Sequence, residues 1–189
     1  MRAIKLAQQG FTLVELLIVV IILALLAAII VPQFASSTED AKISSLDTSL
    51  AVVRTALDLY HQQHGEYPSA IAATGGVACA AGTAGDGAID TEEAFIQQLA
   101  YYTDRDGAAC SQQNAGAFPY GPYLKKAELS ANAISEDATM VIVSDGDLSL
   151  VPPANTLAGW RFDNVSGKFV ADIRDPNNLD PAGNDYYTH

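Results

Sequence analysis

The chain of 189 residues has few basic residues and no recognisable catalytic motif. It carries 10 Lys and Arg against 22 Asp and Glu, a formal net charge of −12, and such an acidic surface repels nucleic-acid phosphates. Its adjacent basic pair, Lys125-Lys126, is typical of a solvated turn or strand edge. The sequence shows no nucleophile elbow, phosphate-binding loop or metalloprotease helix. We therefore expect no nucleic-acid partner, and a membrane-anchored enzyme is a disfavoured class of function.

The chain does have one long apolar run near its N-terminus. Residues 11–31 read FTLVELLIVVIILALLAAIIV, which at about 1.5 Å per residue makes a helix of roughly 31 Å, enough to cross a bilayer core. A single acid, Glu15, interrupts the run, and a carboxylate in such a span costs on the order of 2.5–3.5 kcal/mol without a partner. A free amine from another copy of the chain would supply that partner. Alternatively, Glu15 reaches water at the membrane face and is favoured by the helix dipole.

Residues 1–10, MRAIKLAQQG, form a short basic leader before this run. Arg2 and Lys5, with no acid beside them, predict a cytoplasmic N-terminus by the positive-inside rule. An ordinary secretory signal is cut after its apolar region, whereas here Gly10 precedes that region. A cut after Gly10 would leave the apolar helix on the mature protein, with Phe11 as the new N-terminus.

The segment GFTLVEL at residues 10–16, followed by an apolar stretch and Pro32, resembles the prepilin signature of type IV pilins and type II secretion pseudopilins. The resemblance implies that a prepilin peptidase cleaves after Gly10 and methylates the amino group of Phe11. It also implies that Glu15 meets the N-terminal amine of a neighbouring subunit in a filament core. Removing one partner of such a buried pair typically costs about 3–5 kcal/mol. Pro32 is expected to kink the helix, since proline removes a backbone hydrogen bond.

The helical pattern continues beyond Pro32 to about residue 63. Apolar residues spaced 3, 4, 3, 4 and 3 apart form one stripe, and charged residues lie off it. This amphipathic half needs a sheet to cover its stripe. The stripe consists of Ile43, Leu46, Leu50, Val53, Leu57 and Tyr60.

The rest of the chain predicts a connector and a sheet. A short helix begins near residues 90–93, and β-rich runs at 138–143, 147–151, 157–163 and 168–172 are separated by turns, which favours antiparallel pairing. Trp160 is expected in the core. The fold class is α+β, a pilin fold with a long N-terminal helix packed on a C-terminal antiparallel β-sheet. The expected divisions are 1–10 (leader, removed), 11–33 (transmembrane or filament-core helix), 34–63 (amphipathic half), 64–137 (connector) and 138–189 (sheet and Asp/Asn-rich tail).

Two cysteines, Cys79 and Cys110, both follow the apolar span and so lie on its outward side. Oxidising conditions there favour a disulfide, and closing a loop of about 30 residues gains roughly 3–4 kcal/mol in the chain-entropy model. The alternative is a zinc site with His61 and His64. It is disfavoured because the cysteines are not closely paired in sequence.

The tail clusters oxygen-bearing side chains in a turn-rich segment. Calcium takes six to eight oxygen ligands from such loops, and the resemblance raises the idea, since major pseudopilins bind calcium in a C-terminal loop. The candidate ligands are Asp175, Asn177, Asp180 and Asp185. Their spacing does not match an EF-hand, and a solvated tail is the favoured interpretation. No other cofactor is expected.

The resemblance implies a structural subunit of a type IV pilus-like filament. The chain would be anchored in the inner membrane as a single-pass protein before assembly and would then enter an extracellular or periplasmic filament. Its partners would be further copies of itself, the prepilin peptidase and an inner-membrane assembly platform. Two alternatives stay open: a pseudopilin of a type II secretion system, and a minor pilin for adhesion or DNA uptake.

Overall fold

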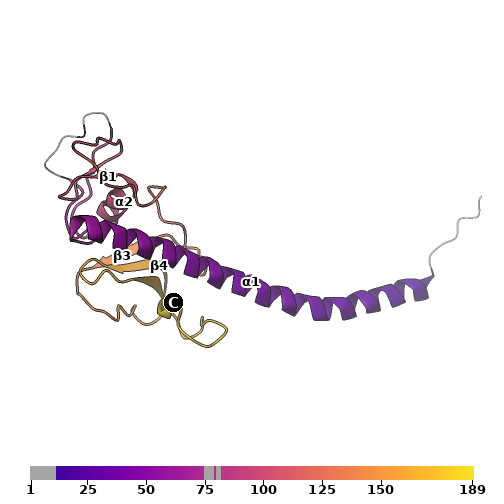
Figure 1. Cartoon of the computed structure of the whole chain (residues 1–189). Helices are drawn as coiled ribbons and strands as arrows, with labels where there is room; N and C mark the ends of the chain where they lie inside the picture. Colours follow the sequence, from indigo (N-terminus) through magenta and orange to yellow (C-terminus); the bar gives the residue numbers. More distant parts are fainter. Residues whose placement is uncertain (1–11, 75–78, 80–81) are drawn as a thin grey trace, which may run out of the picture. The chain divides into compact units, whose positions relative to one another are not determined.

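The computed structural model describes residues 12–74, 79 and 82–189. The described chain divides into two compact units, one ending at Ala41 and the other comprising Lys42–His189. Helix α1, Leu13–His64, begins in the first unit and ends in the second (Figure 1). The leader and its cut site, Gly10 and Phe11, lie outside the described residues.

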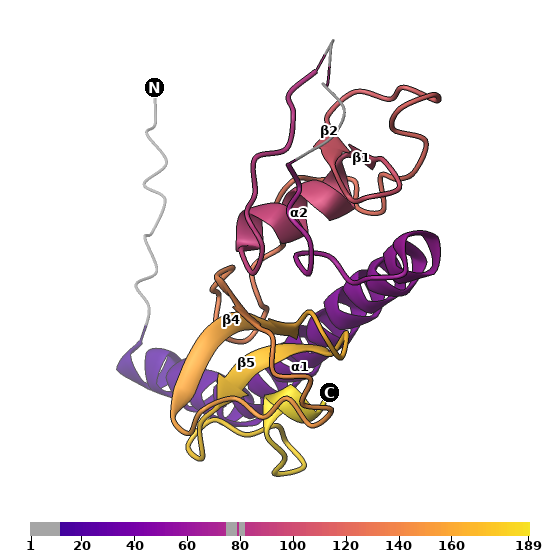
Figure 2. The same cartoon turned by 90° about the vertical axis from the view of Figure 1, so that its left-hand side faces the viewer.

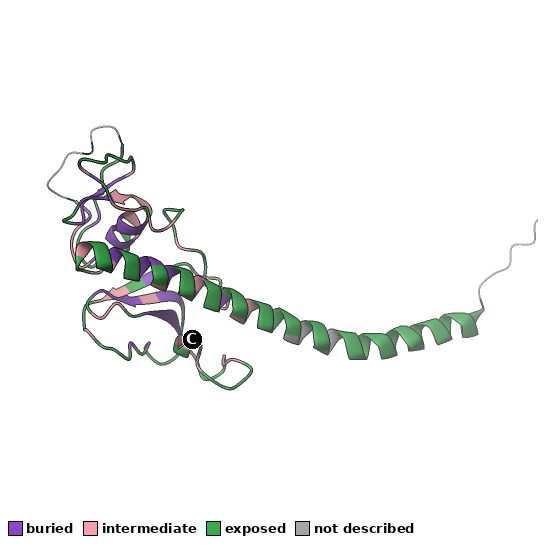
Figure 3. Cartoon of the chain, viewed as in Figure 1, coloured by how far each residue is buried: buried purple, intermediate pink, exposed green. Residues whose placement is uncertain are grey.

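The second half of α1 forms one wall of the core, as its apolar stripe predicts. Leu46, Leu50, Leu57 and Tyr60 are at most 1% exposed and Val53 is buried, whereas Ile43 is partly buried at the edge. In Figure 3 the buried residues gather in the second unit, where this part of α1 meets the sheet. Burying a leucine side chain contributes about 1.5–3 kcal/mol. The stripe therefore provides much of the force that holds helix and sheet together.

The C-terminal sheet has three strands in the order β3-β4-β5: Met140–Val143, Thr156–Asp163 and Phe169–Arg174. Figure 2 shows β4 and β5 lying across the second half of α1. Strands β4 and β5 pair antiparallel. Strands β3 and β4 pair parallel, with Met140 opposite Trp160. The sheet is therefore mixed, and the expectation of a wholly antiparallel sheet was wrong.

The reason lies in residues 147–151, which were expected to form a strand and do not. Asp147 Oδ1 accepts hydrogen bonds from the backbone N–H and hydroxyl of Ser149, at 2.9 and 2.7 Å. Such local side-chain bonds compete with a strand ladder, and prolines at 152 and 153 have no N–H to donate. The chain thus crosses over from β3 as an irregular loop and reaches β4 in the parallel direction.

The turn from β4 to β5 is where the sequence predicts it. Asp163 accepts bonds from the N–H groups of Val165 and Gly167 through its carboxylate and its carbonyl respectively, at 2.9 and 2.8 Å. Gly167 has φ +74°, and a Cβ at this position would clash with the ring of Tyr67. Only glycine meets both demands. Trp160 is buried as expected, and its Nε1 donates to the carbonyl of Ser130 at 2.9 Å.

The connector folds around helix α2, Glu92–Ala100, whose predicted start is confirmed. Thr91 caps the helix, its hydroxyl accepting from the N–H of Ala94 at 3.2 Å. Ala94, Phe95, Gln98 and Leu99 are buried. Beyond it, two short strands that the sequence did not predict, β1 Tyr102–Thr103 and β2 Ala109–Cys110, pair antiparallel.

Candidate functional site

The apolar half of α1 is the part of the molecule that differs most from a soluble domain. Residues Leu13–Ile30 are long and apolar enough to span a membrane, and none of them is buried in the structure. A globular protein rarely leaves so large an apolar surface without a partner. This segment therefore needs lipid or other protein chains around it.

The first turn of this helix is closed by a capping box formed by Thr12 and Glu15. The Thr12 N–H and hydroxyl donate to Oε2 of Glu15 at 2.8 and 2.7 Å. In return the Glu15 N–H donates to the Thr12 hydroxyl at 3.2 Å. These bonds satisfy backbone donors that a helix start leaves open. Glu15 therefore has a role within its own chain, and the Thr-x-x-Glu spacing is a sequence signal for it that was missed.

Helix α1 continues where the apolar run gives way to polar residues. Ser37 and Thr38 donate their hydroxyls to the carbonyls of Gln33 and Phe34, at 3.0 and 2.8 Å. Hydroxyls bonded in this way to the preceding turn are satisfied even without water. The helix also continues through position 32. A kink at Pro32 stays a prediction.

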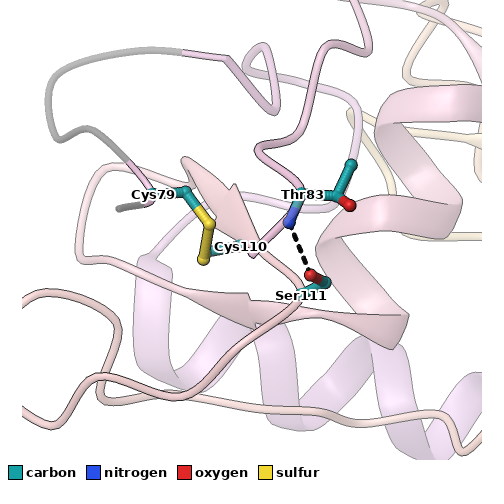
Figure 4. Close-up of a disulfide and its surroundings, with 4 residues drawn as sticks. All are labelled: Cys79, Thr83, Cys110 and Ser111. Atoms are coloured by element: carbon teal, nitrogen blue, oxygen red, sulfur yellow. Dashed lines mark hydrogen bonds between the residues drawn. A yellow bond between two sulfur atoms is a disulfide. The ribbon is translucent and has the colours of Figure 1, made fainter. Parts of the chain in front are cut away.

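A disulfide joins Cys79 to Cys110, as the sequence predicts, with the two Cα atoms 5.6 Å apart (Figure 4). Beside it, the Thr83 N–H donates to the Ser111 hydroxyl at 2.7 Å, and the Ser111 N–H donates to the Thr83 carbonyl at 2.9 Å. The disulfide thus ties Cys79 of the connector to strand β2.

The structure disfavours the zinc alternative, since both cysteines are in the disulfide. His61 stacks on Tyr67 with ring centroids 4.2 Å apart. His64 Nε2 lies 3.1 Å from the Tyr123 hydroxyl and 3.0 Å from the Thr103 hydroxyl. Burial lowers the pKa of His64, although contacts with Arg105 and Asp104 oppose that shift. Both histidines therefore pack at the exit of α1.

The tail is more ordered than a solvated segment would be. Tyr186, in the short 3-10 helix Tyr186–Thr188, is buried against the core. Asp180 accepts from the N–H groups of Asn184 and Ala182, at 2.7 and 2.9 Å. Hydrogen bonding from Asn184 holds the pKa of Asp180 below its usual range. This carboxylate is thus already used to shape the loop.

The other calcium candidates have local roles or lie apart. Asp175 Oδ1 accepts from the backbone N–H of Asn177 at 3.0 Å, and Asp185 precedes the 3-10 helix as its N-cap residue. Among the residues that the structure describes, no three His, Cys, Asp or Glu side chains form a group that could hold a metal ion. Calcium binding by the tail stays a prediction, testable by whether chelation moves the melting temperature.

One contact that the sequence did not predict fastens the tail to α1. Arg54, one of the charged residues that lie off the apolar stripe, is half-buried. It donates from Nε and Nη2 to the Phe169 carbonyl, at 3.1 and 2.9 Å, and from Nη1 to the main-chain oxygen of His189 at 3.0 Å. His189 in turn places Nδ1 2.9 Å from Asp47 and Nε2 3.4 Å from Asp180. The helix thus holds both strand β5 and the tail.

The chain is similar to known proteins over about a third of its length. Residues 5–31 match the family model of the prokaryotic N-terminal methylation motif. The chain is 42% identical over 62 residues to the type II secretion system core protein G of Pseudomonas aeruginosa, covering 33% of this chain and 44% of that protein. The fimbrial protein of Neisseria meningitidis is 39% identical over 62 residues, covering 33% and 36%. No solved structure matches the chain.

These matches and the fold agree on the class of protein. Each relative matches about a third of this chain, and the match spans less than half of that relative's own length. The structure adds a long N-terminal helix whose second half packs on a small mixed sheet, an α+β pilin-like arrangement. The chain thus carries the prokaryotic N-terminal methylation motif and is similar, over about a third of its length, to type II secretion core proteins and a fimbrial protein.

Proposed function

We propose that this protein is a structural subunit of a type IV pilus-like filament. The observation that carries the proposal is the unburied apolar half of α1, Leu13–Ile30, which lies within the segment that matches the methylation motif. In the membrane the segment is covered by lipid. In a filament it is covered by the same segment of neighbouring copies.

Moving the helix from lipid into a helix bundle exchanges one apolar surrounding for another. Hydrophobic area therefore does little to set the register, which depends on packing and on polar contacts. Glu15 supplies the polar contact of this span. Cleavage after Gly10 by a prepilin peptidase would create an amine on Phe11, and pairing that amine of one subunit with Glu15 of the next neutralises both charges in a dry core.

The filament also accounts for the other proposed partners and locations. The basic leader keeps the N-terminus in the cytoplasm, so residues 42–189 lie outside the inner membrane before assembly, held by an assembly platform. The disulfide suits that oxidising side. The relatives named above are called secretion and fimbrial proteins, which supports a structural role over an enzymatic one.

A comparison of Glu15→Ala with Glu15→Gln tests this function. The glutamine side chain can still accept the Thr12 bonds of a capping box but carries no charge. We expect both variants to be processed normally and both to lose most filament assembly, measured by electron microscopy and by mass spectrometry of sheared filaments. If Glu15→Gln assembles normally and only Glu15→Ala fails, Glu15 acts through the capping box and the pairing model is wrong.

Blocking the cut gives an independent control on processing. Replacing Gly10 by a bulky residue such as Phe is expected to leave the uncut precursor in the membrane, with its mass higher by that of the leader. Filaments that contain this uncut variant at normal levels would contradict the proposal.

A pseudopilin of a type II secretion system is the second candidate, since core protein G of that system is among the relatives. Deleting the gene separates the two. Loss of surface filaments with secretion intact supports a pilus, whereas loss of protein secretion without loss of visible filaments supports a pseudopilus.

A further inference from the structure

A groove beside the second half of α1 combines an apolar lining with a basic rim. It has a volume of about 300 Å³. Its apolar lining consists of Val52 of the helix, Leu124 and Leu129 of the connector, and Trp160 of strand β4. Val52 is 54% exposed. An apolar groove of this kind accepts a side chain from a partner.

The rim of the groove carries positive charge, which is the less common sign in this acidic chain. Lys125 and Lys126 line it and are exposed, with Glu128 as the one acid beside them. No ion pair involves either lysine within the described part of the chain. Because the chain as a whole has a net charge of −12, two copies repel each other over most of their surfaces. This groove is a place where an acidic segment of another copy meets opposite charge.

The loop after strand β3 has the complementary chemistry. Leu148 is 72% exposed, and the exposed acids Asp145 and Asp147 stand beside it in the sequence. The loop is held in place, since the Ser144 hydroxyl donates to Asp90 at 2.6 Å and the Ser166 hydroxyl donates to the Asp147 carbonyl at 3.4 Å. Leu148 is therefore presented to solvent by a fixed loop.

We propose that the acidic loop around Leu148 of one copy docks into the groove lined by Val52 and Trp160 of another copy, with Lys125 and Lys126 facing Asp145 and Asp147. The proposal rests on the proposed function, because the second copy is a filament neighbour. Exposed charge pairs contribute little affinity, so the lysines would mainly set orientation. Groove and loop share no residue, so the contact is heterologous and propagates from copy to copy, which is the geometry of an open filament.

Cysteine cross-linking in assembled filaments tests the contact. Val52→Cys and Leu148→Cys are placed in separate copies and co-produced, or combined in one chain, and then mildly oxidised. Cys79 and Cys110 do not compete, since they are already joined. We expect dimers only when both variants are present, and a ladder of dimers, trimers and longer species from the doubly substituted chain.

Leu157→Cys is the matched control, because Leu157 is an exposed leucine, 51% accessible, on strand β4. A chain that carries Val52→Cys and Leu157→Cys should give no ladder of cross-linked species. An equal ladder from Leu157→Cys, or cross-linking of Leu148→Cys to itself, overturns the proposal. So does cross-linking of Val52→Cys to Ile18→Cys of a neighbour instead, which would seat the apolar helix in the groove.

Charge exchange tests the rim. In the doubly cysteine-substituted chain, Lys125→Glu with Lys126→Glu should reduce the ladder about five-fold or more, and adding Asp145→Lys should restore part of it. Lys42→Glu with Lys168→Glu makes the same charge change elsewhere and should have no such effect. An equal loss from both pairs overturns the proposed orientation. Filaments without the ladder overturn this contact alone, whereas absence of filaments from the unsubstituted chain overturns the proposed function.

Discussion

The two halves of α1 use the same secondary structure for opposite purposes. From Leu13 to Ile30 the helix carries apolar residues on every side and none of them is buried, whereas the second half has one apolar stripe that is buried against the sheet. A helix that is hydrophobic all round needs an apolar surrounding, and an amphipathic one needs a partner on one face. The first half thus depends on lipid or other subunits, while the second is stabilised by its own chain.

The largest effect should follow from shortening the stripe. Leu50→Ala is expected to cost about 2–5 kcal/mol of unfolding free energy, because it leaves a cavity between α1 and the sheet. Leu17→Ala, the same change in the exposed half, should leave that value unchanged. Chemical denaturation of the full chain in detergent measures both. A similar cost for both variants would contradict the distinction between the two halves.

Removing the disulfide should have the next largest effect on the unfolding free energy of residues 42–189. Cys79→Ser with Cys110→Ser is expected to lower stability by roughly 3–4 kcal/mol, the chain-entropy value for a loop of this length. Melting of the native protein in a reductant should reproduce the loss, and Ser111→Ala should not. An unchanged melting temperature would mean that the connector is held by its other contacts.

Arg54 joins the second half of α1 to the tail. Arg54→Met removes three hydrogen bonds from a charged donor and should cost about 1.5–3 kcal/mol. Arg105→Met changes an exposed arginine and serves as the control in the same denaturation series. Equal stability of the two variants would show that the tail docks without Arg54.

The smallest effect concerns pH at the exit of α1. Because burial lowers the pKa of His64, the folded protein binds a proton there less readily than the unfolded chain. The stability from this site is complete above the ordinary pKa of about 6.5 and is lost as pH falls through the lowered folded value. His64→Gln should therefore lose less stability than the native protein between pH 7 and pH 5. Parallel pH profiles in denaturant would contradict this.

Much of the fold could be predicted because its signals are local. The apolar stripe from Leu46 to Tyr60, the turn ending at Gly167 and the start of α2 each depend on a short spacing of residue types. The parallel pairing of β3 with β4 could not be predicted from such spacing. It depended on whether Asp147 and Ser149 would bond to each other or join a strand, and that is a competition between local and distant partners.

The features of the candidate site likewise fall into those that local sequence spacing can predict and those that depend on distant partners. The span and its single acid are visible in the sequence, and so is the Thr12 to Glu15 capping box, although it was overlooked. The docking of Arg54 and His189 is different, since their partners lie 115 to 142 positions away in the chain. No spacing rule reaches that far.

An apolar helix with an acid near its start, an amphipathic continuation and a cysteine pair that can close can all be predicted from the sequence of this protein. Periodicity and composition carry that information because each residue's preference for lipid, core or water is its own. The mixed sheet, the docked tail, and the separate positions of the Val52 groove and the Leu148 loop become visible only in the folded chain. Those features arise where distant segments meet, and there the free energy depends on both partners.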